Sequence, residues 1–296
     1  MKIDGVFSGG GIKAYAFIGS LQSIYNHNLE FKRVAGTSAG AIMASFLASG
    51  YTLSEIEKSF ENLDLKLFLD ASVLNNVIPG MKWLSLYFQM GLYRGKKIED
   101  WLYYKLAEKN VYTFGDLPKG QLKIVVSDLT LGKLVVIPDD LERIYGISPK
   151  IFPVATAVRM SAGFPYFFMP KKLRGKSQNK SIIVDGGLLS NFPMWIFENS
   201  SAKNARPILG VKLSESTEKV RPQKIKTALD MLHALFSTMK QAHDARYISK
   251  SEKNNIIFIP VENITAMDFH LDQEEKENLI KAGRKSTDQF LKFWPK

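Results

Sequence analysis

The chain has 296 residues, with 40 lysines and arginines against 29 aspartates and glutamates, a formal net charge of +11 and no cysteine. A hydrophobic content of 45% with 23% charged residues is typical of a globular protein, which excludes a globally disordered or fibrous chain. Without cysteine, the chain has no disulfide, no thiol nucleophile and no cysteine-ligated zinc site.

The positive charge is concentrated in the second half of the chain. Residues 150–296 contain 24 basic and 14 acidic side chains, whereas residues 1–149 are nearly balanced. This excess is typical of a protein that meets nucleic acid or an anionic membrane, but also of a solvated surface that maintains solubility. We find no helix-turn-helix, RNA-binding or zinc signature, so we expect no nucleic-acid partner.

The sequence predicts neither a signal peptide nor a membrane span. Asp4, Lys13 and three successive glycines interrupt the N-terminal apolar segment. The uncharged stretch 34–54 is too rich in Gly, Ser, Thr and Ala to be a span. We therefore expect a cytoplasmic protein whose contact with the membrane is peripheral.

Predicted strands and helices alternate along the chain. The strands are expected at 2–7, 31–35, 121–126, 133–137, 181–184, 206–212 and 256–260. The helices are expected at 14–25, 39–48, 52–62, 96–109, 149–161 and 222–249, with a last helix from Asp272. Thr52 and Glu55 have the spacing of a capping box. The alternation predicts an α/β domain with a mainly parallel central sheet.

A nucleophile elbow is predicted after the second strand. Gly36-Thr37-Ser38-Ala39-Gly40 matches G-x-S-x-G between a strand and a helix, which is the context that such an elbow requires. The sharp turn needs small flanking residues such as Gly36 and Gly40, and it exposes the serine hydroxyl beside a helix N-terminus. Ser38 is therefore the candidate nucleophile, with a structural Gly/Ser turn as the alternative.

Two kinds of base could activate Ser38. A Ser-His-Asp arrangement of the α/β-hydrolase type is one alternative, since three of the four histidines follow Asp185. Against it, only 37 residues precede Ser38, and no histidine lies in a glycine-flanked loop after a strand. Asp185 ends a predicted strand and is followed by Gly186 and Gly187, so we expect it to face the elbow from the end of a parallel strand.

The glycine run after the first strand has two interpretations. Gly9, Gly11 and Ala14 satisfy the G-x-G-x-x-G/A dinucleotide-binding pattern, but the acidic residue at suitable separation, Glu30, precedes the second strand. Alternatively, the backbone N–H groups of Gly9, Gly10 and Gly11 form an oxyanion hole, with Lys13 adding positive charge or fixing the loop.

Taken together, these motifs resemble the bacterial-type patatin-like phospholipase family. The resemblance rests on Gly9–Lys13, Gly36–Gly40 and Asp185–Gly187, supported by residues 127–133 and 157–165, and it covers about residues 3–195. One departure is Ala14, where the family usually has glycine.

The resemblance implies a three-layer α/β/α fold and hydrolysis of lipid acyl esters by a Ser-Asp dyad, without a cofactor or metal. It implies that Ser38 is the nucleophile, Asp185 the general base, and Gly10 and Gly11 the oxyanion donors, with a phospholipid or another acyl-ester lipid as substrate. We expect one patatin-like hydrolase domain over residues 1–296, because the dyad joins residues 38 and 185, with a helical cap insertion at 51–110.

Two further segments bear on the lipid substrate. Residues 67–93 are rich in aromatic residues and methionine, and they form either an apolar cap over the acyl site or part of the core. The segment 171–180 is a basic loop after several aromatic residues, which suits either an anionic bilayer surface or a solvated loop.

Overall fold

The structure is a computed structural model. It describes residues 1–61, 63–71, 86–175, 180–198, 206–214, 225–248, 253–261 and 271–295. Within these residues the central sheet has eight strands in the order β10-β9-β1-β2-β4-β8-β7, with β5 paired to β4. The strands are β1 (Lys2–Phe7), β2 (Glu30–Thr37), β4 (Leu122–Asp128), β5 (Lys133–Ile137), β7 (Lys171–Arg174), β8 (Lys180–Asp185), β9 (Ile208–Ser214) and β10 (Ile256–Pro260). A separate two-stranded sheet pairs β3 (Gly91–Tyr93) with β6 (Tyr166–Phe168).

The sheet is parallel on one side and antiparallel on the other. Strands β10, β9, β1, β2 and β4 pair in parallel, whereas β5 and β8 are antiparallel to β4 and β7 is antiparallel to β8. The mainly parallel arrangement confirms the predicted α/β class. Parallel strands need crossover connections, which explains why helices separate them along the chain.

The ends of β2 and β8 meet beside β4. Thr37, the last residue of β2, pairs with Val125, and Asp185, the last residue of β8, pairs with Val126. Strand β5 pairs with the same stretch of β4, so it occupies the other edge of that strand. Strands β2 and β8 therefore lie on one edge of β4, run towards each other and stop end to end.

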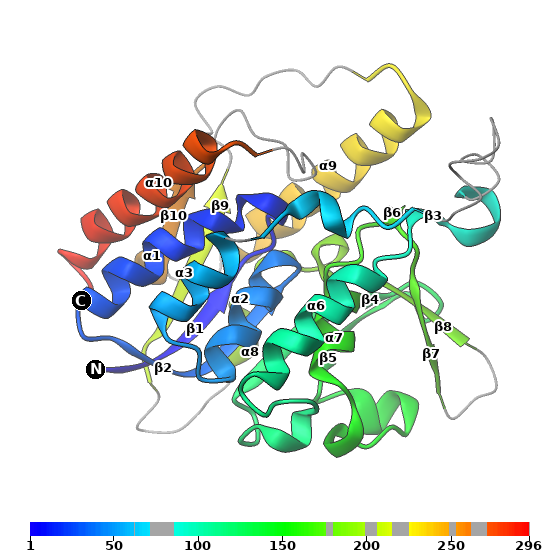
Figure 1. Cartoon of the computed structure of the whole chain (residues 1–296), viewed down its shortest axis with the longest axis horizontal. Helices are drawn as coiled ribbons and strands as arrows, with labels where there is room; N and C mark the ends of the chain where they lie inside the picture. Colours follow the sequence, from blue (N-terminus) through cyan, green and yellow to red (C-terminus); the bar gives the residue numbers. More distant parts are fainter. Residues whose placement is uncertain are drawn as a thin grey trace.

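Helices cover both faces of the sheet, as Figure 1 shows. The larger core, which includes Ile3, Phe7, Val34 and Ile124, is covered by α1 (Tyr15–Asn26), α2 (Ala39–Ala48), α3 (Leu53–Glu61), α6 (Lys96–Ala107), α7 (Val154–Ser161) and α10 (Gln273–Leu291). The smaller core contains Val6, Ala35 and Val125, packed against Phe192, Met194 and α8 (Trp195–Glu198). Successive residues of β1, β2 and β4 thus enter opposite cores, as the pleat of a strand requires, and the three-layer α/β/α fold follows.

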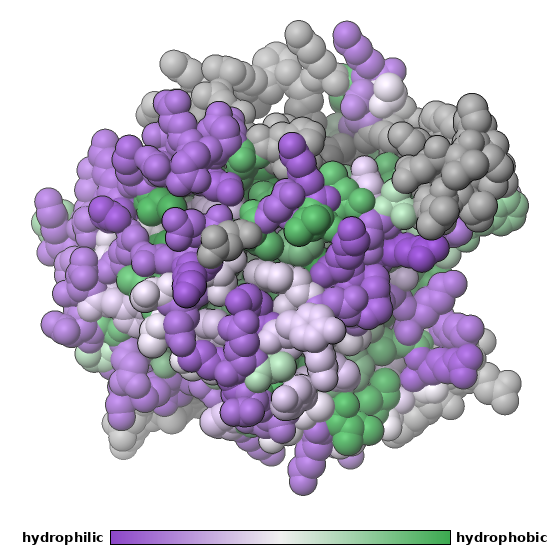
Figure 2. Space-filling model, in the orientation of Figure 1, coloured by the Kyte–Doolittle hydropathy of each residue, from purple (hydrophilic) through white to green (hydrophobic). Residues whose placement is uncertain are grey.

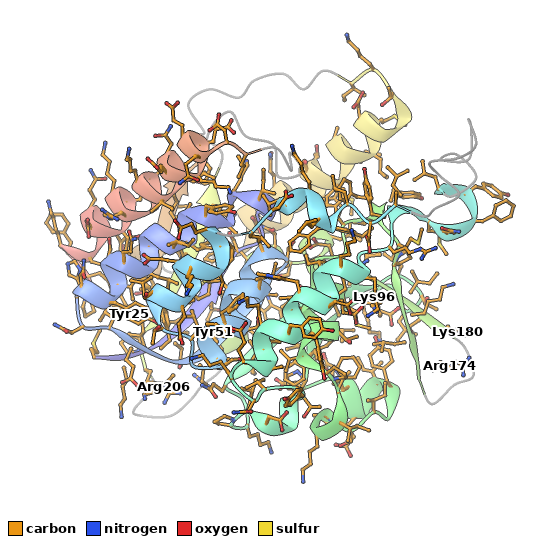
Figure 3. All side chains as sticks on the ribbon, viewed as in Figure 1. Tyr25, Tyr51, Lys96, Arg174, Lys180 and Arg206 are labelled. Carbon is orange, nitrogen blue, oxygen red and sulfur yellow. The ribbon has the colours of Figure 1, made fainter. Side chains whose placement is uncertain are left out.

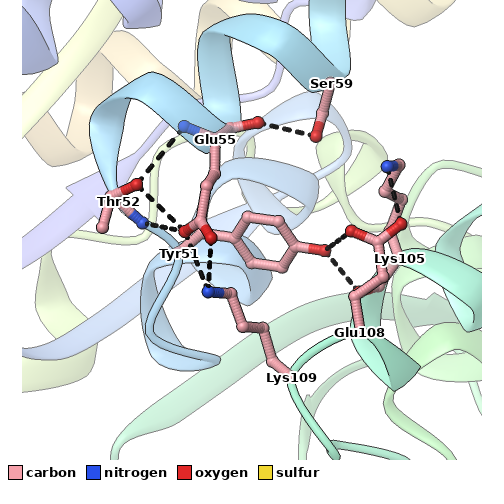
Figure 4. Close-up of polar contacts among 7 residues, drawn as sticks. All are labelled: Tyr51, Thr52, Glu55, Ser59, Lys105, Glu108 and Lys109. Atoms are coloured by element: carbon pink, nitrogen blue, oxygen red, sulfur yellow. Dashed lines mark hydrogen bonds and ion pairs between the residues drawn. The ribbon is translucent and has the colours of Figure 1, made fainter.

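The predicted capping box at the start of α3 also ties this helix to α6 (Figure 4). Thr52 N–H donates to Glu55 Oε2 at 2.8 Å, and Glu55 N–H donates back to Thr52 Oγ1 at 3.3 Å. Lys109 Nζ lies 2.8 Å from both oxygens of the same carboxylate, and these bonds lower the pKa of Glu55 to about 2. The Tyr51 hydroxyl donates to Glu108 at 2.9 Å, so the ends of the two helices are joined by hydrogen bonds.

Three local predictions differ from the structure. The helix predicted from 149 starts at Val154, because Pro153 occupies its N-cap with an extended backbone and residues 149–151 form a separate 3₁₀ turn. The basic segment 171–180, predicted as a loop, contains β7 and the first residue of β8. Aromatic residues 166–168, for which no strand was predicted, form β6.

The segment predicted as cap or core is only partly described. Phe68 is buried, whereas Tyr87 and Phe88 are 80% and 69% exposed, and residues 72–85 lie outside the described residues. The α3 and α6 residues of the 51–110 segment contribute side chains to the larger core, while a cap insertion there stays a prediction. Within the described part of the chain, no helix has the length and apolar composition that a membrane span requires.

Figure 2, which has the orientation of Figure 1, shows a mostly hydrophilic surface over α10 and α1. On α9 (Ala228–Ile248), the side chains of Met231, Leu235 and Met239 are exposed.

Candidate active site

Ser38 lies at a strained turn between β2 and α2. Its backbone has φ +53° and ψ −121°, a region that residues with a side chain rarely adopt. The flanking glycines permit this turn, because a Cβ on Gly36 would lie 2.2 Å from the Gly40 carbonyl oxygen and one on Gly40 would lie 2.3 Å from the Phe7 carbonyl oxygen. The predicted strand, sharp turn and helix are confirmed, and close backbone contacts require the small flanking residues.

A second serine holds the strained backbone. Ser38 N–H donates to Ser161 Oγ at 2.9 Å, and the Ser161 hydroxyl donates to the Val125 carbonyl at 2.6 Å. Ser161 is fully buried at the end of α7. No role was predicted for Ser161, although it lies in the 157–165 segment of the family resemblance. Ser161 therefore connects the Ser38 turn to β4, the strand along whose edge β2 and β8 meet.

Asp185 ends β8 next to the elbow and is 4% exposed. Its N–H donates to the Gly163 carbonyl at 2.9 Å, and its Oδ1 accepts the Gly187 N–H at 2.7 Å. Burial raises the pKa of Asp185 to about 6, against the opposing effects of the Gly187 N–H, a side-chain hydrogen bond with Ser38 and the positive charge of Lys240. The carboxylate is therefore a stronger base than an ordinary aspartate and lies within reach of the Ser38 hydroxyl.

The geometric reason given for this pairing from the sequence was wrong. Asp185 does not end a strand parallel to β2, because β8 is antiparallel to β4 while β2 is parallel to it. The two residues meet because β2 and β8 approach each other along one edge of β4. The turn after Asp185 needs glycine, since a Cβ on Gly186 would lie 2.2 Å from the Val125 carbonyl oxygen.

The glycine loop lies beside the elbow. Gly9 N–H donates to the Asn191 carbonyl at 3.0 Å, and a Cβ on Gly9 would lie 3.2 Å from that of Ser38. Gly9 is thus not a free donor, which differs from its predicted place in the oxyanion hole. Gly11 has φ +58°, and within the described residues neither the Gly10 nor the Gly11 N–H has an acceptor.

Helix α9 closes the site from the C-terminal half of the chain, next to the 3₁₀ turn η6 (Gly186–Leu188) that follows Asp185. Asp244 is buried on this helix, where it accepts a hydrogen bond from Asn191 Nδ2 at 3.2 Å and forms an ion pair with Lys212. Lys13 is buried beside the glycine loop and interacts electrostatically with Lys240. Neither Asn191 nor the charged residues of α9 were predicted, because no local motif marks them.

The residues of the alternative interpretations lie elsewhere or outside the description. Glu30 is at the start of β2, at the opposite end of that strand from the elbow, and it pairs with Lys32. His27 follows the last residue of α1, and its Nδ1 contacts the Ser23 carbonyl. His270 lies outside the described residues, and the side chains of His233 and His243 are not described.

The described residues thus combine a three-layer α/β/α fold with a strained serine turn beside a buried carboxylate. A model of the patatin-like phospholipase family matches residues 5–198, and the chain belongs to that family. This membership supports a lipid hydrolase as the class of enzyme.

Two relatives match nearly the whole chain. The uncharacterized protein YqhO of Bacillus subtilis is 48% identical over 295 residues, which cover 99% of both chains. The uncharacterized protein R571 of Acanthamoeba polyphaga mimivirus is 27% identical over 95% of this chain and 91% of its own.

Solved structures share the fold at low sequence identity. VipD from Legionella pneumophila has a TM-score of 0.58 and 20% sequence identity. The match covers 98% of this chain and 66% of VipD. The type III effector ExoU of Pseudomonas aeruginosa has a TM-score of 0.51 and 17% identity over 98% of this chain, which spans 53% of ExoU.

Proposed function

We propose that the chain hydrolyses acyl esters of lipids, of the phospholipase A or lysophospholipase type, with Ser38 as nucleophile and Asp185 as general base. The observation that best supports this proposal is the end-to-end approach of β2 and β8, which brings a strained serine and a buried carboxylate of raised pKa together. Enzymes match the pKa of a catalytic base to their working pH by such burial.

In the proposed mechanism, Asp185 accepts the Ser38 hydroxyl proton while Oγ attacks the ester carbonyl carbon. The N–H groups of Gly10 and Gly11 donate to the oxygen that becomes negative, and each such donor is worth about 3 kcal/mol. Asp185 then protonates the departing alcohol, which leaves an acyl group on Ser38. A water molecule gives its proton to Asp185 and attacks this acyl group, and the proton returns to Ser38 as the fatty acid leaves.

In this mechanism the remaining site residues position the reacting groups. Gly9 anchors the glycine loop through its bond to the Asn191 carbonyl, and Lys13 adds positive charge near the site. Gly36 and Gly40 allow the elbow turn, and Gly187 fixes the Asp185 carboxylate.

The proposal is tested with purified wild type, Ser38→Ala and Asp185→Asn on p-nitrophenyl butyrate and on phospholipid vesicles. Both variants should lose hydrolysis of both substrates, and a fluorophosphonate should add its mass to wild type but not to Ser38→Ala. Ser127→Ala is the control, because Ser127 is a fully buried serine on β4 whose hydroxyl has no hydrogen-bond partner among the described residues. Full activity of Ser38→Ala or of Asp185→Asn would refute the dyad.

We further propose that an anionic bilayer contacts the β7–β8 hairpin. Lys172, Arg174 and Lys180 are exposed there, and Figure 3 draws Arg174 and Lys180 at the hairpin end away from the helices. Lys171 is engaged elsewhere, since it forms an ion pair with Glu99 at 2.6 Å. Basic residues near an anionic surface contribute about 1 kcal/mol each.

This contact is measured by sedimentation with phosphatidylcholine vesicles that contain or lack phosphatidylserine. Replacing the three exposed hairpin residues by glutamine should weaken binding to the anionic vesicles about 100-fold, and added salt should weaken wild-type binding. The control removes the same charge from exposed Lys281, Lys285 and Lys292 at α10. Binding that is independent of phosphatidylserine, or equal in both triple variants, would overturn the assignment.

A further inference from the structure

Residues 190–191, between η6 and α8, contact two parts of the candidate site through their backbone. The Ser190 carbonyl accepts a hydrogen bond from the Thr37 hydroxyl at 3.0 Å, and the Asn191 carbonyl accepts one from the Gly9 N–H at 3.0 Å. Both Ser190 and Asn191 are buried. Two consecutive carbonyls thus bind the residue before the proposed nucleophile and the first glycine of the glycine loop.

The side chain of Asn191 reaches a third part of the site, the turn that holds the proposed general base. A Cβ on Gly9 would lie 2.4 Å from Asn191 Oδ1, and a Cβ on Gly187 would lie 3.3 Å from the same atom. The Cβ on Gly187 would also lie 2.9 Å from Asp185 Oδ1, the oxygen that accepts the Gly187 N–H. Asn191 Oδ1 therefore lies between a glycine of the oxyanion loop and a glycine of the base turn, and it fills the space that their missing side chains leave.

A buried ion pair determines which way the Asn191 amide points. Asp244 on α9 is paired with Lys212 on β9, and it accepts a hydrogen bond from Asn191 Nδ2 at 3.2 Å. An ionised carboxylate only accepts hydrogen bonds, so the NH2 group of the amide faces Asp244 and its oxygen faces the two glycines. Both charged residues lie outside residues 5–198, which the family model matches.

We propose that Asn191 is a positioning residue that sets the distance between the oxyanion donors and the Asp185 carboxylate, and that Asp244 acts through it. The inference rests on the proposed function and extends the site to the C-terminal third of the chain. In this role Asn191 contacts the glycine loop and the base turn rather than the reacting atoms. Its loss should therefore weaken binding of the transition state far more than binding of the substrate. A displacement of about 1 Å in such groups can lower a rate about 100-fold.

The test uses trifluoromethyl propyl ketone, which carries the same alkyl chain as the acyl group of p-nitrophenyl butyrate. Ser38 Oγ adds to its carbonyl carbon, the hydroxyl proton passes to Asp185, and the ketone oxygen becomes an anion that needs the oxyanion donors. Asn191→Ala should raise the inhibition constant of this ketone and lower kcat/KM for the ester by the same factor, about 10- to 100-fold, while KM changes less than about 3-fold. A merely structural role would reduce the number of active molecules, counted by fluorophosphonate labelling, and would leave the inhibition constant unchanged.

A second variant keeps the shape of the site. Asp244→Asn preserves the volume of the side chain but removes the charge that orients the Asn191 amide, so it should raise the inhibition constant of the ketone about 10-fold. The double variant with Asn191→Ala should match Asn191→Ala alone, because Asp244 acts through Asn191. The control is Asn255→Ala, which removes the acceptor of a 2.9 Å hydrogen bond from Trp294 Nε1 and should leave the inhibition constant as in wild type.

A wild-type inhibition constant in Asn191→Ala or in Asp244→Asn would overturn the positioning role. Additive effects of the two substitutions would overturn the part assigned to Asp244. If wild type neither hydrolyses the ester nor binds the ketone, the proposed function itself fails, and the positioning role fails with it.

Discussion

Replacing Asp185 by asparagine should stabilise the fold while it abolishes hydrolysis. Asparagine keeps the oxygen that accepts the Gly187 N–H and the approximate volume of the side chain, so it removes mainly the buried charge. The pKa of Asp185 is about 6 in the folded chain against 3.8 for the free group. A difference of about two pKa units corresponds to about 3 kcal/mol of stability that the ionised carboxylate costs the folded state.

The sign of this effect changes with pH in a defined way. Well below pH 3.8 both the folded and the unfolded wild-type chains hold the Asp185 proton, and the carboxylate costs nothing. As the pH rises from 3.8 to 6, the unfolded chain ionises first, so wild type loses stability and reaches the full cost above pH 6. Asp185→Asn has no such loss, so its advantage grows from zero near pH 3.5 to about 3 kcal/mol near pH 7.5.

The assay is urea unfolding of wild type and Asp185→Asn at several pH values, followed by circular dichroism. The same pKa should appear in catalysis, since kcat/KM of wild type rises with pH through about 6 as the base loses its proton. Two results would refute the argument that the Asp185 carboxylate is buried at a cost to stability. One is an Asp185→Asn protein that is less stable than wild type near pH 7.5, and the other is a stability difference that does not depend on pH.

Three further substitutions test other parts of the site and fold. Ser161→Ala leaves the Ser38 N–H without its acceptor, so it should lower kcat and cost about 1–3 kcal/mol in urea unfolding. Ser127→Ala removes a hydroxyl that has no partner within the described part of the chain, and it should cost far less. Gly9→Ala places a methyl group 2.4 Å from Asn191 Oδ1, so ester hydrolysis should fall sharply and a wild-type rate would contradict the contact. Arg159→Met removes hydrogen bonds to the carbonyls of Gly95, Arg94 and Met169, so it should lower the free energy of unfolding by about 3 kcal/mol or more. Arg143→Met, the control at an exposed ion pair, should lower it by at most about 1 kcal/mol. Equal losses would contradict the anchoring role of Arg159.

The elbow illustrates what local sequence can determine. Ser38 needs an abrupt change from strand to helix, and the glycines at 36 and 40 are the residues that such a close backbone approach permits. The contact between Gly36 and Gly40 lies within five consecutive positions, so it can be read from the sequence alone, whereas the contact of Gly40 with the Phe7 carbonyl involves β1. The capping box at Thr52 and Glu55 and the alternation of strands and helices are local in the same sense, and they were predicted correctly.

The sequence by itself therefore determined the α/β class, the family resemblance and the candidate residues Ser38 and Asp185. Only the tertiary structure decided the direction of β8, because the same buried residues allow a strand to pair in either direction. That direction explains why Ser38 and Asp185 meet. It likewise brought Ser161, Asn191 and Lys240 to the site from distant segments and engaged the Gly9 N–H with Asn191. The excess positive charge could be assigned from the sequence only to the second half of the chain. Folding placed Lys212 and Lys240 around the candidate site. It left Lys172, Arg174 and Lys180 on an exposed hairpin.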